Sequence, residues 1–492
     1  MRITEWGVIV DNAPVEFDSL HADRYGGSNW TTVITGENGT KKSLLLRILL
    51  EGCLDVKRAF RIGNHASISP YIRTNQSYIT STTEYSSNSF TNHLHHKNIH
   101  VIAIAGTPFD RFPRKTNYLR AARRSLYGGN YNYTYLGLKA ANGTMGTAHS
   151  VRTLGYIILE AVEFQSDGWE SARKVIDFLG LRSELSISIK PNAAMEASNR
   201  EMRAEARQRQ GVTRREKAVE FLESTRRKTE VQHFNDETLH RLLGDSNLIW
   251  QLARKLQDSS IDINVNFEDV VPLIEETAGF SMRELLVLLQ ANVITIDKLL
   301  VGKKNGGWVT VDDDLSSGQW NMLFTMLGLA LTVRDESVIL IDEPENSLHP
   351  DWQRRYIDLL GRILDSRRGC HIVIASHSPL IASGVKEGTG NVIRLLREPD
   401  GPLGIRAHRE TLTYGWDAGD VFRETFGMRS TRALSFEARA DMALELVRDG
   451  KQASDEFKLI AEELVQAARS LPPQDTMRLI VDAISQVANR RD

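Results

Sequence analysis

Cysteine is nearly absent from the sequence: 492 residues contain only Cys53 and Cys370. Two cysteines cannot build the disulfide framework of a small secreted scaffold, and neither has the CxxC spacing of a zinc or redox motif. No apolar run reaches the roughly 18 residues that a membrane-spanning helix needs. The first residues, MRITEWGVIVDNAP, are also too polar for a signal peptide. These absences predict a cytoplasmic protein with no membrane partner.

The chain also lacks an excess of charge of either sign, with 61 Lys and Arg against 63 Asp and Glu, a net charge of −2. This balance excludes a polycationic nucleic-acid coat and a strongly acidic protein. The composition, 41% hydrophobic and 25% charged, is that of an ordinary globular protein. At about 150 residues per domain, the length suggests about three domains or one large domain with insertions.

Short apolar runs indicate a buried parallel sheet. Their length and flanking turns suit strands that are covered on both faces. The runs are 31–35, 101–105, 338–341 and 372–375. An amphipathic helical pattern over 352–364 separates the last two runs, which predicts a β-α-β crossover. We therefore expect an α/β fold with a mostly parallel sheet and flanking helices.

A glycine-containing loop, residues 36–43 (GENGTKKS), separates the first strand from a helical pattern. In a phosphate-binding loop of this kind, backbone N–H groups face the phosphates, a lysine reaches them and a serine binds Mg²⁺. Lys42 and Ser43 fit the last two roles. The usual pattern has glycine where this chain has Lys41, and a side chain there strains the turn or crowds the phosphates. We therefore expect slow turnover.

Two carboxylates, Asp342 and Glu343, directly follow the apolar run 338–341. They lie at the carboxyl end of a predicted parallel strand, where open α/β sheets bind their ligands. Asp342 suits a Mg²⁺ ligand, and Glu343 suits a group that orients or deprotonates an attacking water.

Two further motifs can contact phosphate. Residues 315–319 (LSSGQ) lead into an apolar helical run, and a serine and a glycine at a helix start can receive a γ-phosphate. His377 directly follows the run 372–375, where its ring can hydrogen-bond a γ-phosphate.

Taken singly, each motif has an ordinary explanation: a glycine-rich turn, two acids at a strand end, an N-capped helix or a structural histidine. Together and in this order, they resemble the ABC-type ATPase superfamily. Walker A corresponds to 36–43, the signature to 315–319, Walker B to 338–343 and the switch histidine to His377. Residues 346–350 (NSLHP) then occupy the position of the D-loop, which in that superfamily crosses the dimer interface.

The resemblance implies ATP and Mg²⁺ as cofactors. Glu343 would position water, His377 would sense the γ-phosphate, and Ser43 and Asp342 would hold Mg²⁺. Serine and glycine of the signature would act in trans, on ATP held by a second copy. The residues expected to contact ATP are Gly36, Asn38, Gly39, Thr40, Lys41, Lys42, Ser43, Leu44, Ser316, Ser317, Gly318 and Gln319.

The spacing of the motifs favours one branch of the superfamily. Ser43 and Leu315 are 272 positions apart, whereas the two motifs lie much closer together in transporter domains. In this long spacing and in the sequence EPENSLHP, the chain resembles the soluble group that contains RecF, SMC heads, OLD nucleases and bacterial defence ATPases. The stretches 107–113, 133–137 and 415–427 are similar to antiphage ATPases of the Septu type. Retron-linked relatives and the ATPase of the PARIS system are alternatives.

This resemblance implies an ATP-hydrolysing subunit of an antiphage complex that controls a separate nuclease of the HNH or Toprim type. The subunit would form a homodimer around ATP or a higher oligomer such as a trimer of dimers. After Leu396 the chain lacks the glutamate and Asp-x-Asp pattern of a Toprim nuclease, so we expect none in this chain. The alternatives are a RecF/SMC-like repair ATPase that clamps DNA without an effector, and a non-hydrolysing scaffold.

The chain is expected to divide into four regions. Residues 1–190 form the first part of the ATPase head, with an N-terminal β part, Walker A and a basic insertion, and residues 301–432 form the second part. Residues 191–300 are expected to be a helical insertion, because 199–230 combine ten Lys and Arg with six Asp and Glu in a helix-favouring stretch. Residues 433–492 are expected to be a helical tail.

The near-neutral balance hides a split. Residues 56–159 contain thirteen Lys and Arg but only two acids, a net charge of +11, which leaves −13 for the rest of the chain. Within this block, residues 111–133 interleave cations with Phe and Tyr, a combination that suits nucleic-acid backbone and base stacking. The same surface suits an acidic phage protein. Alternatively, the basic block binds no such ligand, because acidic parts of the chain or of its partner subunit neutralise it.

Overall fold

The computed structural model describes residues 28–54, 100–107, 110–112, 133–139, 146–192, 260–268, 281–290, 293–399, 404–428 and 430–489. For the strands within 3–17 and 60–80 it describes the backbone. The chain divides into two compact units, Met1–Trp416 and Asp417–Asp492, which are described separately.

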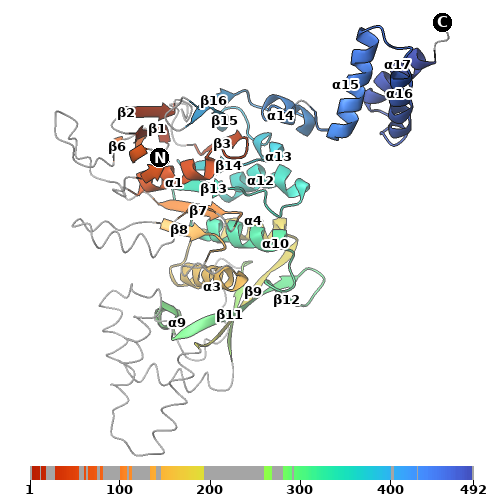
Figure 1. The fold of residues 1–492 in the computed structure, drawn as a ribbon. Coiled ribbons are helices and arrows are strands. Elements are labelled where there is room, and N and C mark those ends of the chain that lie inside the picture. The colour runs from red at the N-terminus through yellow and green to blue at the C-terminus, as the bar shows by residue number, and fades with distance from the viewer. Residues whose placement is uncertain are drawn as a thin grey trace, which may run out of the picture. The chain divides into compact units, whose positions relative to one another are not determined.

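A seven-stranded sheet forms the centre of the first unit, in the order β16-β15-β3-β14-β13-β7-β8 (Figure 1). Neighbouring strands are parallel except for the edge pair β15 and β16, which is antiparallel. The strands are β3 (Trp30–Gly36), β7 (Val101–Ala105), β8 (Tyr133–Leu136), β13 (Val338–Asp342), β14 (His371–Ala375), β15 (Gly390–Arg397) and β16 (Ile405–Glu410). The expected mostly parallel sheet is confirmed, and each predicted apolar run is one of its strands.

The middle strands are buried along their whole length because both faces of the sheet are covered. Every residue of β7, β13 and β14 is buried, as expected for parallel strands between helical layers. In register, Asp342 at the end of β13 pairs with Ala375 of β14 and Ala105 of β7. The loops that follow these strands therefore leave the sheet at one common edge.

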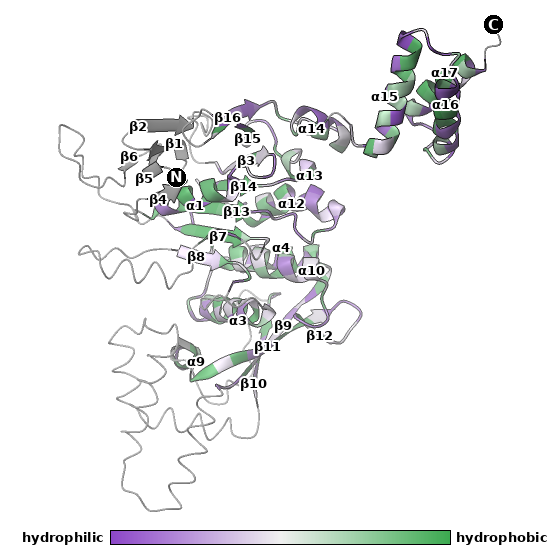
Figure 2. Ribbon diagram, in the orientation of Figure 1, coloured by the Kyte–Doolittle hydropathy of each residue, from purple (hydrophilic) through white to green (hydrophobic). Residues whose placement is uncertain are grey.

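Alternate residues of each strand enter two separate cores. In β13, Ile339 and Ile341 face one core, whereas Val338 and Leu340 face the other. Helix α1 (Lys42–Cys53) covers the second core, and its leucines fill it. Figure 2 shows the hydrophobic colouring of the central strands β7 and β13. The period of two thus divides the strand residues between two opposite layers.

The first core is covered by several helices that pack on the opposite face. These are α3 (Thr147–Glu163), α4 (Trp169–Phe178), α10 (Ser317–Met322), α11 (Gly328–Thr332) and α12 (Pro350–Ile363). A π-helical turn, Leu323–Leu327, joins α10 to α11, so the apolar run after the signature is helical as predicted. Helix α12 is the predicted crossover between β13 and β14. The short helix α13 (Pro379–Ala382) follows the switch histidine.

A second, four-stranded antiparallel sheet lies against α3 in the order β10-β9-β11-β12. Its elements are β9 (Leu181–Pro191), β10 (Ile261–Asn266), β11 (Ile294–Lys303) and β12 (Trp308–Thr310), with α9 (Met282–Gln290) before β11. The expectation of a helical insertion over 191–300 is therefore wrong for β10 and β11. Residues of β10 alternate between buried and more exposed positions, which is the period of a strand. The charged stretch 199–230 lies outside the described residues.

A five-stranded antiparallel sheet forms the N-terminal β part that the sequence predicts. Strand β1 pairs with β2 and β5, and β5 also pairs with β4 and β6. The strands are β1 (Ile3–Val10), β2 (Ala13–Phe17), β4 (Phe60–Ile62), β5 (His65–Thr74) and β6 (Tyr78–Thr80).

The second unit is helical and has its own apolar core. Its helices are α14 (Ala418–Glu424), α15 (Leu434–Arg448), α16 (Asp455–Ala468) and α17 (Thr476–Ala488). Phe457 and Ile460 of α16 are buried against residues of α15 and α17. The Arg432 guanidinium binds the Asp475 carboxylate through both terminal nitrogens, and Asp475 also caps α17. The helical character expected for the C-terminal region is confirmed.

Helices long and apolar enough to cross a lipid bilayer do not occur among the residues that the structure describes.

Candidate nucleotide-binding site

The glycine-containing loop connects β3 to α1 at the common edge of the sheet. Gly36 and Gly39 have φ values of 143° and 85°, which favour glycine, and a Cβ at Gly36 would lie 2.7 Å from the Leu395 carbonyl oxygen. Thr40 turns the loop back on itself, because its hydroxyl donates to the Glu37 carbonyl over 2.8 Å. The loop thus approaches the phosphate-binding shape that its sequence predicts.

Lys42 begins α1 and turns its side chain back into the loop. Its Nζ donates to the carbonyls of Gly36, over 2.8 Å, and Glu37, over 3.1 Å. Burial lowers the pKa of Lys42 to about 8, although nearby Glu343, Glu345 and Asp342 favour the charged form. The ammonium group therefore sits where the loop can present it to an anion.

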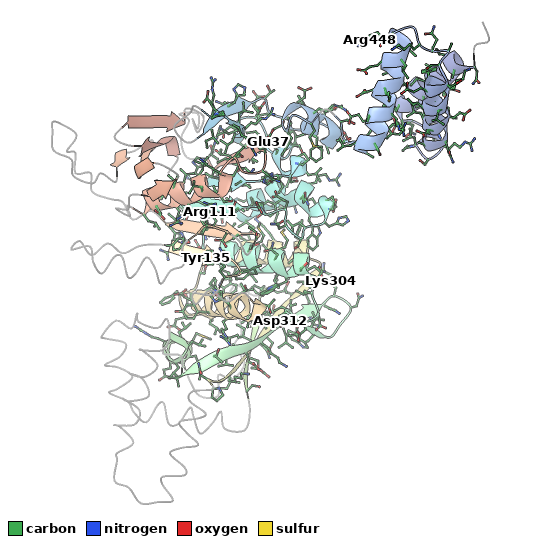
Figure 3. The ribbon with its side chains drawn as sticks, viewed as in Figure 1. Glu37, Arg111, Tyr135, Lys304, Asp312 and Arg448 are labelled. Carbon is green, nitrogen blue, oxygen red and sulfur yellow. The ribbon has the colours of Figure 1, made fainter. Side chains whose placement is uncertain are left out.

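The remaining loop residues divide between surface and core. The Asn38 carbonyl accepts a hydrogen bond of 2.7 Å from Arg397. Leu44 is buried and packs in the core under α1, so its backbone rather than its side chain is available to a ligand. Figure 3 labels Glu37 in this loop.

Lys41 adopts the left-handed conformation, with φ 63° and ψ 24°, immediately before α1. This conformation costs an L-residue about 1–2 kcal/mol but costs glycine almost nothing. The missing glycine of the motif is thus replaced by a residue that keeps the glycine-like backbone. The strain expected from the sequence has a definite location in the structure.

Ser43 and Asp342, the two expected Mg²⁺ ligands, lie side by side. The Ser43 hydroxyl donates to Asp342 Oδ1 over 3.0 Å, although 299 positions separate the two residues. Asp342 is only 1% exposed, and burial raises its pKa to about 7, with the negative charges of Glu343, Asp110 and Glu345 adding to the effect. A hydroxyl and a carboxylate are oxygen donors of the kind that Mg²⁺ takes, and a cation would relieve the burial of this carboxylate.

Glu343 and His377 project from adjacent loops. Glu343 Oε1 lies 4.0 Å from His377 Nε2, and the other oxygen accepts a hydrogen bond of 3.1 Å from Asn346. Burial and the charge of Lys42 lower the pKa of His377, so its ring is predominantly neutral at pH 7. Glu343 has a φ of 47°, a strained value for glutamate.

The signature motif forms a helix start that is separate from the phosphate-binding loop. Ser316 caps α10: its hydroxyl accepts from the Gln319 N–H over 3.2 Å, and its own N–H donates to Gln319 Oε1. Ser317 is exposed at the helix start. A Cβ at Gly318 would lie 2.4 Å from the Ser347 carbonyl, so the signature packs directly against the D-loop. The two residues of the capping box bind each other, not the glycine-containing loop.

Two carboxylates that are not among the expected site residues lie beside the site. Asp110 follows β7, and its carboxylate accepts from the Tyr135 hydroxyl and the Phe112 N–H over 2.9 Å each. Burial raises the pKa of Asp110. The sequence gives one indication of a site residue here, because Asp110 follows an apolar strand. Only the pairing of β7 with β13, however, places Asp110 near Asp342.

Glu345 is the second such carboxylate. It accepts a hydrogen bond of 2.8 Å from the Ser376 hydroxyl and another from the His377 N–H. In the sequence, Glu345 could have been noticed as a third acid that closely follows Asp342 and Glu343. The fold brings its carboxyl group to the loop that carries His377.

The expected basic surface at 111–133 is described only at its ends. Residues 113–132 lie outside the described residues, and Arg111 is exposed. Phe112 and Tyr133 are buried, so the expectation that they belong to a stacking surface is wrong. Both side chains pack in the core under α1, because the strands that carry or precede them belong to the central sheet.

One known protein family matches a range of the chain that contains part of this site. The family described as AAA domain, putative AbiEii toxin, Type IV TA system, matches residues 184–383. That range contains the signature, Walker B, the D-loop and the switch histidine.

Two curated relatives match parts of the chain. Protein ea59 of Escherichia phage lambda is 29% identical over 181 residues, which cover 34% of this chain and 32% of that protein. The Septu protein PtuA of Bacillus thuringiensis is 27% identical over 165 residues, which cover 29% of this chain and 37% of that protein. The chain thus spans about a third of the length of these relatives.

Among solved structures, the Smc head domain of Pyrococcus furiosus, with an extended coiled coil and bound to the C-terminal domain of ScpA, aligns with a TM-score of 0.29. The alignment has 11% identity and covers 83% of this chain and 96% of that one. The family match over residues 184–383 and the partial similarity to PtuA support the resemblance, drawn from the motifs, to ABC-type ATPases of the soluble group that contains RecF, SMC and PtuA proteins.

Replacing Lys41 with glycine tests the strained loop. Lys41→Gly should raise the free energy of unfolding by about 0.5–1 kcal/mol, since the left-handed penalty exceeds the greater freedom of glycine in the unfolded chain. It should also speed ATP hydrolysis. Chemical denaturation and phosphate release measure the two effects. Lys41→Ala is the matched control, because it removes the amine but keeps the left-handed backbone of a non-glycine residue. If Lys41→Ala and Lys41→Gly had the same stability and the same rate of hydrolysis, the effect would come from the lost charge and not from relieved strain.

The pKa values of the two buried groups predict an optimum for nucleotide binding. Below about pH 7 Asp342 is protonated and loses its affinity for Mg²⁺, and above about pH 8 Lys42 loses its positive charge. The affinity for ATP in the presence of Mg²⁺ should therefore peak between about pH 7 and 8. Below about pH 7, the increase in ATP affinity that Mg²⁺ causes, which we call the gain from Mg²⁺, should fall by up to about tenfold per pH unit. Titration of a fluorescent ATP analogue with and without Mg²⁺ measures this gain. The part of this pH dependence that comes from Asp342 should disappear in Asp342→Asn; equal profiles in this variant and the unmodified protein would contradict the assignment.

Proposed function

We propose that this protein is the ATPase subunit of a cytoplasmic bacterial antiphage complex, which binds and slowly hydrolyses ATP and thereby controls a separate nuclease. The observation that carries the ATPase part is the hydrogen bond of 3.0 Å between Ser43 and Asp342, beside the Lys42 ammonium and the neighbouring Glu343 and His377 side chains. Residues from distant parts of the sequence thus meet at one edge of the sheet, and a cation, Mg²⁺ ligands and a carboxylate that can orient water are the groups that phosphoryl transfer uses.

Each side chain has a role that follows from its chemistry. The Lys42 ammonium would bind the β- and γ-phosphates, and the loop N–H groups would add further donors. Ser43 and Asp342 would hold Mg²⁺, which when bound neutralises charge that develops on the phosphates. Glu343 would orient the attacking water and accept its proton. The predominantly neutral His377 ring can donate a hydrogen bond to the γ-phosphate without adding charge.

The signature supports a site shared between two copies. Ser317 is exposed, and Gly318 rests against Ser347 of the D-loop, so that both motifs belong to one surface. We propose that this surface closes on the nucleotide held by Lys42 of a second copy. The functional unit is then a homodimer around ATP, or a higher oligomer such as a trimer of dimers.

The role in defence rests on the similarity to the Septu protein PtuA over 165 residues. The effector is proposed to be a separate chain of the HNH or Toprim type. In the described part of the second unit, the elements are the helices α14–α17, whereas a Toprim module places its acids on an α/β pattern. Residues 111–133 are retained as a candidate surface for nucleic acid or an acidic phage protein, with Arg111 as its exposed described cation.

Replacing the proposed water-orienting carboxylate separates binding from hydrolysis. Glu343→Gln should retain ATP binding but slow hydrolysis by about 10²-fold or more, because the amide cannot accept a proton. The ATP-bound dimer should consequently live longer. Equilibrium binding, phosphate release and light scattering after gel filtration measure the three properties.

The exposed glutamate Glu387 of the same unit provides the matched control, and Glu387→Gln should leave all three properties unchanged. If Glu343→Gln changed neither turnover nor the lifetime of the assembly, the protein would be a non-hydrolysing scaffold instead.

Expression together with the neighbouring genes tests the link to an effector. A tagged chain should copurify with an HNH or Toprim protein encoded next to it, as identified by mass spectrometry. Cells that carry both genes should restrict phage plating, and Lys42→Ala should change that protection. Copurification with recombination proteins and no effect on phage plating would favour the RecF/SMC-like repair alternative.

A further inference from the structure

Glu345 connects the two loops that carry the proposed hydrolytic residues. It lies two residues after Glu343, and its carboxylate reaches the loop of residues 376–378, which we call the switch loop. One oxygen accepts from the Ser376 hydroxyl over 2.8 Å, and the other accepts from the His377 backbone N–H. Both oxygens of this carboxyl group are thus occupied by the switch loop, although burial raises the pKa of Glu345.

The switch loop is held from the far side as well. The Ser376 hydroxyl also accepts from the Ser378 N–H over 2.9 Å, and the Ser378 hydroxyl donates to Gln353 Oε1 over 2.7 Å. Gln353 Nε2 in turn donates to the Leu348 carbonyl of the D-loop over 2.9 Å.

These bonds close a ring. It runs from Glu345 through the switch loop and Gln353 of α12 to Leu348, whose N–H donates back to the Glu345 carbonyl over 3.0 Å. Ser376 is fully buried and Ser378 nearly so, so the ring is shielded from competing water at those points.

The ring has a direct consequence for geometry. Glu343 Oε1 and His377 Nε2 are 4.0 Å apart without a hydrogen bond between them, so their relative position is set by the loops that carry them. Glu345 joins those two loops directly, in addition to the strand pairing of β13 with β14 and the bond of 2.9 Å from the Glu343 N–H to the Ala375 carbonyl.

We propose that Glu345 is a positioning residue for ATP hydrolysis, which fixes His377 relative to Glu343 through its two hydrogen bonds to the switch loop. Because the ring includes the Leu348 carbonyl, a shift of the D-loop when a second copy binds would reach His377 through Gln353 and Ser378. This inference rests on the proposed hydrolysis at this site.

Substitutions at Glu345 test the proposal by separating turnover from binding. Glu345→Ala should lower kcat by about tenfold or more, because both bonds to the switch loop are lost, while the KM for ATP should stay within about twofold. Glu345→Gln should be intermediate, since a single amide oxygen can accept from one of the two donors. Ser376→Ala removes one of the two bonds to Glu345 and also the bond that the Ser376 hydroxyl accepts from the Ser378 N–H, so it should lower kcat at least as much as Glu345→Gln. Glu387→Gln again serves as the control and should match the unmodified protein.

A double substitution distinguishes positioning from a general loss of structure. If Glu345 acts through His377, Glu345→Ala should add little to the effect of His377→Ala, whereas independent roles would multiply. Multiplicative effects, or an unchanged kcat in Glu345→Ala, would overturn the proposal.

If thermal denaturation shows that Glu345→Ala does not fold, the same measurements are made on Glu345→Gln and Ser376→Ala. Absence of hydrolysis in the unmodified protein would reject the proposed function itself, whereas normal hydrolysis that responds to His377→Ala but not to Glu345→Ala would reject this inference alone.

Discussion

The burial of a carboxylate, Asp342, at the carboxyl edge of the sheet is the constraint on which the rest of the site depends. Burying an ion is costly unless it is paired or hydrogen-bonded, and Asp342 has the Ser43 hydroxyl as its neutral partner. Three further acids, Asp110, Glu343 and Glu345, raise its pKa, so the cluster favours protonation or a bound cation. Lys42 is one counter-charge of this cluster, and burial lowers its own pKa. Lys139 is another, because its Nζ lies 3.5 Å from Asp110 Oδ2. The chemistry proposed for this site uses this concentration of negative charge beside the Lys42 ammonium.

Backbone strain is concentrated in the same place. Among the described residues, five non-glycine residues have positive φ, and three of them, Lys41, Glu343 and Ser347, lie in the glycine-containing loop, Walker B and the D-loop. Such conformations persist only where surrounding structure imposes them. Close contacts show how it does so: a Cβ at Gly106 would lie 2.1 Å from the Glu343 carbonyl, and Gly318 is equally close-packed on Ser347. The functional loops are therefore held by backbone-to-backbone packing rather than by their own side chains alone.

Much of the central sheet was predictable because its strands are buried on both faces. Continuous apolar runs such as 101–105 and 338–341 leave little ambiguity, and the motif residues that follow them must share one edge once the strands are parallel. The antiparallel sheet was missed because long stretches of sequence separate β10 and β11 from β9, although β10 itself alternates apolar and polar residues. Phe112 and Tyr133 were misplaced for a similar reason: an aromatic residue between cations reads as a surface residue until strand pairing shows it to be buried.

The sequence by itself determined the class of chemistry that we propose, because the residue types in the glycine-containing loop, the signature, Walker B and the switch motif are those that suit phosphate and Mg²⁺ and lie on short local elements. It could not determine that Asp110 lies near Asp342, or that Glu345 reaches the loop of His377. Those two neighbours depend on the parallel register of β7, β13 and β14, which brings the loops after these strands to one edge. Long-range strand pairing decides such neighbours, since it depends on the packing of the whole sheet rather than on local sequence.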